Sequence, residues 1–339
     1  MASLNNDFFR RQLLDYLRCG QLTRSDKGLF FISPELVYRK NARTIVNYFN
    51  RLNWTPPPAN EKQVVIKNYN GTNEIALKIS EYLNETAGDQ LLGAYVHGSI
   101  GNSEEVPYSD FDGIVILKSS CFVNKEVLFR VVKALKETAH MMLKMDPLQH
   151  HGWFVLCEKD LLDYPEYYFP HELFLHAACL FGNSHLTIHL RAAGYHNEFM
   201  KGFNHLSDSI LNKIGSKKFL ENRYGFKNLL SEFMLLPAVY FQAKTGKGIF
   251  KKLSFELLRK EQGIMHGIMD EVSAIRETWE YKAPEEFMRK LNSEGPYSSH
   301  RRTKLISGKL PYHLTNKFDD QMLVKMKDLV KDLRGRLKQ

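Results

Sequence analysis

Apolar residues are grouped in two ways along the chain: short runs alternate with helical spacing before about residue 164, and helical spacing alone continues after it. The short runs have the length and composition of strands, and turn residues bound them. The predicted strands cover 63–66, 92–97, 113–117 and 152–157. Apolar positions that recur every three or four residues predict helices at 75–83 and 127–143. This part of the chain therefore predicts a small mixed sheet with helices packed on it.

From about residue 164 onward the pattern is helical. The helices predicted in this part cover 171–182, 195–213, 217–244, 254–279, 283–292 and 316–337. Two more are predicted at 5–18 and 34–53, and the Pro-rich linker 55–60 separates them from the rest because helices do not continue through successive prolines. We expect an α+β protein with an N-terminal helical extension at 1–60, a sheet domain at 61–165 and a helical domain at 166–339.

A glycine turn and a pair of carboxylates occur at neighbouring strand ends of the predicted sheet. Gly98 and Ser99 follow the strand 92–97, and Asp110 and Asp112 open the strand at 113–117. Glycine permits a close backbone approach, and such a turn can offer backbone N–H groups to phosphates. The i, i+2 spacing places both carboxylates on one face, with Phe111 directed into the core. Because two carboxylates on one face repel each other, the pair is typical of a divalent cation site.

The order of strand, Gly-Ser turn, strand and Asp-x-Asp resembles the signature of the DNA polymerase β-like nucleotidyltransferase superfamily. The match covers about 70–160, and Gly113 departs from the apolar residue expected after the second Asp. A catalytic domain followed by a helical domain is similar to small-molecule members of the kanamycin nucleotidyltransferase type. The resemblance implies a small mixed-sheet nucleotidyltransferase domain followed by a C-terminal helical domain.

The resemblance also implies an activity. Gly98 and Ser99 would hold the β- and γ-phosphates of a nucleoside triphosphate, for which ATP is the first expectation. Asp110 and Asp112 would bind Mg²⁺, in the roles of catalytic and metal residues. The expected reaction transfers a nucleoside monophosphate to an acceptor hydroxyl and releases pyrophosphate. The sequence does not specify which nucleotide is used or the oligomeric state.

The superfamily places a third carboxylate on a following strand, and the predicted strand 152–157 contains none. His150 and His151 precede that strand, while Glu158 and Asp160 follow it. Each of them is a candidate to complete a metal site or act as a base, although a polar strand entrance and a solvated turn are the more ordinary explanations. The missing carboxylate leaves two outcomes, a base supplied by another domain or a site that binds nucleotide without turning it over.

The predicted helical domain supplies further candidates. Glu232 is surrounded by apolar residues in 228–244, which makes it a candidate general base, with an ion pair to a Lys or Arg as the ordinary alternative. Members of the superfamily use a Lys from the helical domain to hold the triphosphate. Lys251 and Lys252, in a basic Gly-containing loop, fit that cofactor-binding role, yet a loop that caps a helix would have the same composition.

Charge bears on the acceptor. The formal net charge is +9, and in 201–339 the Lys and Arg residues outnumber Asp and Glu by 27 to 16. A basic surplus attracts triphosphates or nucleic acid, although Lys-rich helices are also ordinary solvated surfaces. The resemblance favours a small hydroxylated acceptor. The alternatives are tRNA or a protein, as for toxin-type nucleotidyltransferases, or a catalytically inactive nucleotide-binding or scaffolding protein.

The sequence also argues against several classes. The longest apolar stretch, 229–243, contains Glu232 and Pro237, so we expect no membrane span. The first residues lack the apolar core of a signal peptide, from which we expect a cytoplasmic protein. The cysteines show no paired spacing, which predicts reduced thiols with neither disulfides nor zinc; they are Cys19, Cys121, Cys157 and Cys179. The histidines likewise show no zinc-ligand spacing.

Overall fold

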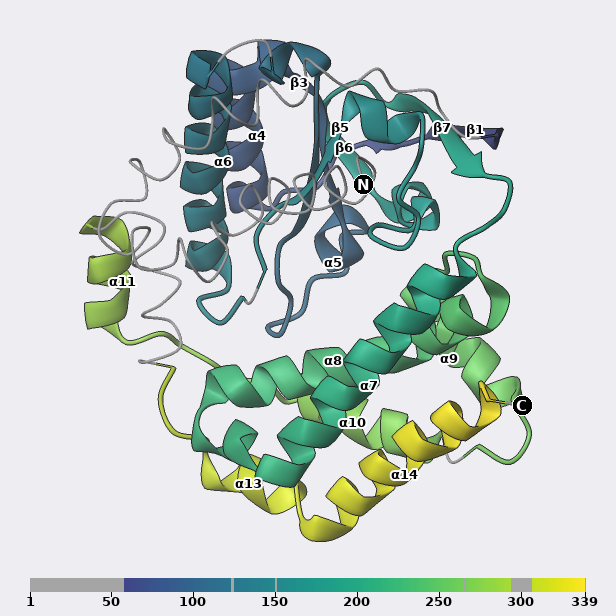
Figure 1. The fold of residues 1–339 in the computed structure, drawn as a ribbon. Helices are drawn as coiled ribbons and strands as arrows, with labels where there is room; N and C mark the ends of the chain where they lie inside the picture. The colour runs from purple at the N-terminus through teal and green to yellow at the C-terminus, as the bar shows by residue number, and fades with distance from the viewer. Residues whose placement is uncertain (1–57, 123–124, 150, 265, 294–306, 339) are drawn as a thin grey trace.

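The computed structural model describes residues 58–122, 125–149, 151–264, 266–293 and 307–338, and these form two regions (Figure 1). One region contains the sheets and the helices that pack on them, and the other is built from helices. The helices predicted at 5–18 and 34–53, together with Cys19 and His150, lie outside the described residues.

The main sheet has five strands in the order β2-β6-β3-β4-β5. Its strands are β2 Lys67–Asn68, β3 Leu91–His97, β4 Asp112–Leu117, β5 Phe154–Cys157 and β6 Ala178–Gly182. The central strand β3 is antiparallel to β4 and β6, while β4 is parallel to β5 and β2 is parallel to β6. This is the mixed sheet that the sequence predicts. Two further strands, β1 Ala59–Val65 and β7 His185–Arg191, form a separate antiparallel pair.

Side chains alternate between the two faces of the main sheet and fill two cores. On one face, Val115 and Val155 pack with residues of α4 (Glu74–Ala87) and α6 (Lys125–Met145), which lie side by side in Figure 1. On the other face, Ile114 packs in a second core with residues from β1, β7 and the segment between β5 and β6. Short helical segments connect these elements: η1 Gly88–Gln90, α5 Gly98–Gly101, η2 Ser119–Phe122, η3 Glu158–Leu161 and η4 His171–His176.

The helical region is organised around α8, Arg223–Thr245. This helix is apolar on most of its circumference and is buried among its neighbours, as expected for a helix without a polar face. Besides α8, the described elements after β7 are α7 His196–Ser216, η5 Lys218–Glu221, α9 Lys251–Lys260, α10 Gly267–Glu277, α11 Glu285–Ser293, α13 Tyr312–Lys317 and α14 Asp320–Arg336. Of these, α11 packs against α6 (Figure 1). Phe287 of α11 and Leu143 of α6 are in one buried cluster.

The structure confirms the α+β class with a small mixed sheet and a C-terminal helical region, but it corrects several elements. The helix predicted at 171–182 is the short η4 followed by strand β6. Its apolar run suits either a buried strand or a helix, and pairing with β3 decides between them. The helix predicted at 254–279 is interrupted between α9 and α10, where Gly263 has a φ of +75°.

Two smaller corrections concern the ends of predicted elements. The helix predicted at 316–337 is interrupted before α14, and the Asp319 side chain caps the new helix by accepting from the Met322 N–H. The last residues of the predicted linker, Ala59 and Asn60, belong to β1. The domain division at residues 60 and 165 stays a prediction, and a division after 191 would keep β6 and β7 with the strands they pair.

Among the described residues, no helix combines the length and apolar character needed to cross a membrane. Cys121, Cys157 and Cys179 are buried and lie outside any disulfide.

Candidate functional site

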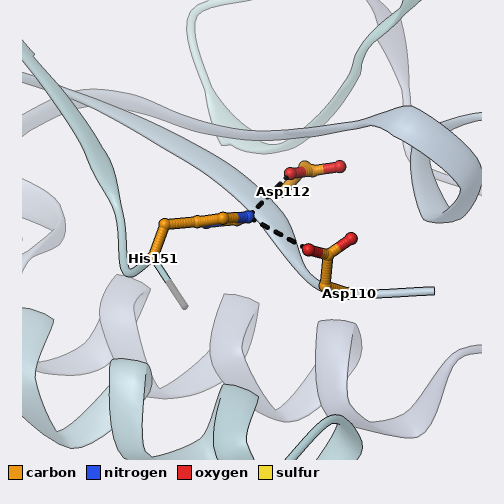
Figure 2. Close-up of side chains that lie close together, drawn as sticks. All are labelled: Asp110, Asp112 and His151. Atoms are coloured by element: carbon orange, nitrogen blue, oxygen red, sulfur yellow. Dashed lines mark hydrogen bonds and ion pairs between the residues drawn. The ribbon is translucent and has the colours of Figure 1, made fainter. Parts of the chain in front are cut away.

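The two carboxylates of the predicted motif point toward one another and toward a single histidine (Figure 2). The Nε2 atom of His151 lies 3.2 Å from Asp110 Oδ2 and 3.2 Å from Asp112 Oδ1. Phe111, between the two Asp residues, is fully buried in the core beneath the sheet. The predicted geometry of the acidic pair is therefore confirmed. The three side chains can offer three metal-ligand atoms within 4.8 Å of one another.

The sheet register explains why His151 is at this place. Strands β4 and β5 are parallel, and Ile114 pairs with Phe154, so a residue just before β5 lies beside the start of β4. The buried side chain of Gln149 fixes the two strand entrances together. Its Oε1 accepts from the Phe111 N–H at 2.8 Å, and its Nε2 donates to the Phe111 carbonyl at 3.1 Å and to the His151 carbonyl at 2.8 Å. Gln149 is thus a site residue that the sequence patterns do not identify.

Protonation follows from these contacts. Burial lowers the pKa of His151, but its hydrogen bonds with Asp110 and Asp112 and their negative charges outweigh burial and raise the pKa well above its ordinary value. The imidazolium therefore offsets the repulsion between the two carboxylates. His97, at the end of β3, is the register partner of Asp112 on β4, and burial lowers the pKa of His97. His97 is consequently the neutral histidine of the two.

The glycine turn is in direct contact with the acidic pair. Gly98 has a φ of +69°, a conformation that residues with a Cβ rarely adopt. A Cβ at this position would lie 2.6 Å from Asp112 Oδ2, so the position excludes a side chain on two grounds. Ser99 follows in the first turn of α5, and its carbonyl accepts from the Glu104 N–H at 2.8 Å. The turn and the carboxylates are adjacent as expected, while the phosphate-binding role of Gly98 and Ser99 stays a prediction.

The two candidate lysines begin α9 but have different surroundings. Lys252 is exposed and forms an ion pair with Glu104. Burial and the charge of the nearby Arg276 lower the pKa of Lys251 to about 8, while the charges of Asp110 and Asp112 act in the opposite direction. Lys251 is therefore within electrostatic reach of the acidic pair. No described residue forms an ion pair with its ammonium group, whereas Lys252 is paired. The triphosphate-binding role of both lysines stays a prediction.

The loop that precedes Asp110 is fastened to the helical region by Tyr108. Its hydroxyl donates to the Lys227 carbonyl of α8 at 3.0 Å and lies 2.9 Å from Ser231 Oγ. The buried Lys227 ammonium donates to the Tyr108 carbonyl at 2.9 Å and pairs with Asp146 at 2.7 Å. The Arg276 guanidinium lies 4.4 Å from the centre of the Tyr108 ring. This network joins the acidic pair's loop, the end of α6 and α8.

The other candidates make local contacts. Glu232 forms an ion pair with Lys213 and accepts from the Ser209 hydroxyl at 2.9 Å, which agrees with the ordinary explanation for a carboxylate in an apolar helix. Its role as a general base stays a prediction. Glu158 accepts from the Ser119 N–H at 2.9 Å, and Asp160 accepts from the Cys157 N–H at 2.7 Å. Both follow the far end of β5, so His151, which precedes β5, is the candidate that completes the ligand group.

Comparisons with known proteins give a limited result. No protein-family model matches the chain, and no curated protein matches it. Among solved structures, the chain is similar to a crystal structure of a spectinomycin adenyltransferase from Enterococcus faecialis with ATP and spectinomycin. That similarity has a TM-score of 0.37 and 12% identity, and it covers 79% of this chain and 100% of that chain. A likeness of this extent assigns no activity, so the function has to be argued from the site.

Proposed function

We propose that the chain transfers a nucleoside monophosphate from a nucleoside triphosphate, most simply ATP, to an acceptor hydroxyl and releases pyrophosphate. The observation that carries this proposal is the convergence of opposite charges from two regions of the molecule. Asp110 and Asp112 contribute negative charge beside the Gly98 turn, and Lys251 contributes a cation from the helical region with which no described residue forms an ion pair. A polyphosphate with its divalent cation matches that distribution, since the cation faces the carboxylates and the phosphates face the ammonium group.

The donor set fits a divalent cation. The carboxylates of Asp110 and Asp112 are hard oxygen ligands of the kind that Mg²⁺ prefers, and both are directed at one point, which His151 Nε2 contacts. When bound, the ion would polarise the α-phosphate and neutralise charge on the departing pyrophosphate. The residues Asp110 and Asp112 would hold it, in the roles that the resemblance implies.

The other residues of the site would bind the triphosphate and align it for the reaction. The Gly98 turn allows the phosphates to approach the backbone without obstruction, and Ser99 adds backbone and hydroxyl donors. Lys251 neutralises charge on the triphosphate, while the Tyr108 network keeps the two regions in register. Catalysis in this proposal comes from alignment and from charge stabilisation, since phosphoryl transfer leaves little covalent work for side chains.

The acceptor that we propose is a small hydroxylated molecule, as the domain order of the resembled enzymes suggests. A tRNA acceptor is the second candidate, because Lys and Arg exceed Asp and Glu by 27 to 16 in residues 201–339. Phosphate contacts with tRNA would make binding fall steeply with salt concentration, whereas binding of a small sugar would change little. Binding of labelled tRNA at two salt concentrations separates these acceptors.

The activity test uses nucleoside triphosphates labelled at the α-phosphate, incubated with the full chain, Mg²⁺ and a cell extract as the acceptor source. Labelled products are separated by size, and pyrophosphate release is measured. We expect Asp110→Asn or Asp112→Asn to lower the rate by at least about 10²-fold with the fold intact. Asp89→Asn, which removes an exposed carboxylate at the opposite end of β3 from the Gly98 turn, is the matched control.

Two outcomes would contradict this assignment. Near-normal turnover in Asp110→Asn or Asp112→Asn would show that the acidic pair does not bind the catalytic metal ion. Nucleotide binding in calorimetry, with no pyrophosphate released from any nucleotide, would instead favour the catalytically inactive nucleotide-binding protein.

A further inference from the structure

We propose that His151 is the third metal ligand of this site, and that its nitrogen makes the site prefer a divalent transition ion such as Mn²⁺ over Mg²⁺. The inference rests on the metal site in the proposed function and refines it. It replaces the missing third carboxylate with a different chemical donor, which changes the ion selected.

The imidazole ring of His151 is oriented as in a metal ligand. His151 Nε2 faces both carboxylates (Figure 2). Its Nδ1 lies 3.3 Å from the carbonyl oxygen of Gly152. Metal-binding histidines commonly donate the proton of the second ring nitrogen to a backbone carbonyl or a carboxylate, which fixes the tautomer and directs the other lone pair to the ion. His151 has both features of that arrangement, because its Nδ1 has a carbonyl acceptor and its Nε2 faces two anionic ligands. The proton that Nε2 carries without a metal would be released to solvent when the ion binds.

The donor atoms of Asp110, Asp112 and His151 are spaced like ligands of one ion. Ligand atoms about 2.1 Å from an octahedral ion lie about 3 Å apart when they are neighbours. The His151 nitrogen lies 3.2 Å from an oxygen of Asp110 and 3.2 Å from an oxygen of Asp112. The separations of the nitrogen from the two oxygens therefore match neighbouring ligands on one ion.

Buried neighbours hold His151 in place. Gln149 is 1% exposed, and its amide bonds to the backbone of Phe111 and of His151 at the same time. The His151 ring also packs 5.6 Å from the ring of Phe154, at the start of β5. A purely electrostatic neighbour of two carboxylates needs no such support, whereas a metal ligand does, because donors must be positioned before the ion binds.

The choice of ion follows from the donor types. Mg²⁺ binds through oxygen and is reluctant to exchange water for nitrogen, while imidazole is a favourable ligand for first-row transition ions. Two carboxylates with one imidazole suit an ion that accepts both, and Mn²⁺ is a useful probe because its unpaired electrons report bound nitrogen. Selectivity at this site is thus assigned to one residue, His151.

The experiment measures binding of the metal alone to the full chain, without nucleotide. Titration calorimetry with MnCl₂ and with MgCl₂ gives the two affinities, and pulsed electron paramagnetic resonance of the Mn²⁺ complex detects coupling to ¹⁴N. We expect Mn²⁺ to bind at least about tenfold more tightly than Mg²⁺. His151→Gln retains a hydrogen-bond donor but lacks the imidazole, so we expect it to lose the ¹⁴N coupling and most of that preference. His151→Asp should favour Mg²⁺ instead.

The outcomes separate this inference from the proposed function. Mn²⁺ that binds the wild-type protein without ¹⁴N coupling, and whose affinity is unchanged in His151→Gln, overturns the role of His151 and leaves the acidic pair in place. Loss of metal binding in Asp112→Asn together with retained ¹⁴N coupling in the wild type supports both. If neither ion binds and no nucleotide is turned over, both proposals fail. The wild-type spectrum decides the question even where a variant does not fold.

Discussion

The sheet region and the helical region supply opposite halves of the candidate site, and they hold their charged groups in different ways. Asp110, Asp112 and His151 are fixed by strand pairing and by the buried Gln149 amide. Lys251 is at the first turn of α9, and no described residue neutralises it. The negative half is therefore paired within the protein itself, whereas the ammonium group of the positive half remains available to an anionic ligand.

The largest expected effect comes from separating the two regions. Lys227→Met would leave Asp146 as a buried carboxylate without its partner and would remove the bond to the Tyr108 carbonyl. Breaking one partner of a buried pair costs about 3–5 kcal/mol. Denaturant unfolding of the variant should show that loss in the free energy of unfolding. An exposed pair, Lys217 with Asp320, provides the control, and Lys217→Met should change stability little.

A loss below about 1 kcal/mol in Lys227→Met would contradict the view that this pair fastens the regions together. The double variant Lys227→Met with Asp146→Leu sharpens the test. Since it removes both charges, it should recover part of the stability that the single change loses.

The second largest effect is expected on turnover, from a substitution in the Gly98 turn of the sheet region. Gly98→Ala would place a Cβ 2.6 Å from Asp112 Oδ2 in a backbone conformation that costs an L-residue about 1–2 kcal/mol. We expect turnover to fall by about 10²-fold because Asp112 must move. Gly202→Ala on α7, where no atom lies within 4 Å of the added Cβ, is the control. Equal rates for the two variants would show that the contact with Asp112 is unimportant.

A smaller effect, on kcat/KM for the nucleotide, is expected from substitution of Lys251 in the helical region. Lys251→Ala should weaken kcat/KM for the nucleotide by about tenfold, the range of a charge-assisted contact. Burial, followed by the charge of Arg276, lowers the pKa of Lys251 to about 8, so its ammonium is lost as pH rises through that value. The KM for nucleotide should therefore rise above about pH 8.

The conservative variant makes this prediction specific. Lys251→Arg keeps a positive charge throughout that pH range, since guanidinium titrates far above it. Its nucleotide KM should not rise near pH 8. A rise of the same size in the wild type and in this variant would assign the pH dependence to another group.

The smallest effect is expected at the neighbouring lysine. Lys252 is exposed and paired with Glu104, so Lys252→Ala should change nucleotide affinity by less than about twofold. Nucleotide affinity is measured for both lysine variants under identical conditions. The result tests whether Lys251, near the acidic pair, contributes more to nucleotide binding than the exposed Lys252. A larger loss in Lys252→Ala than in Lys251→Ala would reverse our assignment.

Local sequence was sufficient for the parts of the site that depend on neighbouring residues. The turn at Gly98 and the shared direction of Asp110 and Asp112 follow from backbone conformation and from the period of two along a strand. The same holds for the central strands and for α8, whose apolar composition alone indicates a buried helix.

Tertiary structure decided everything that depends on residues far apart in the chain. His151 became the partner of the acidic pair through the register of β4 with β5, and the buried amide of Gln149 secures it there. The segment at 178–182 became a strand because β3 offered it hydrogen bonds. Lys251 was distinguished from Lys252 only by where α9 lies relative to Asp110. Periodicity describes which face a residue occupies, but only packing determines what that face meets.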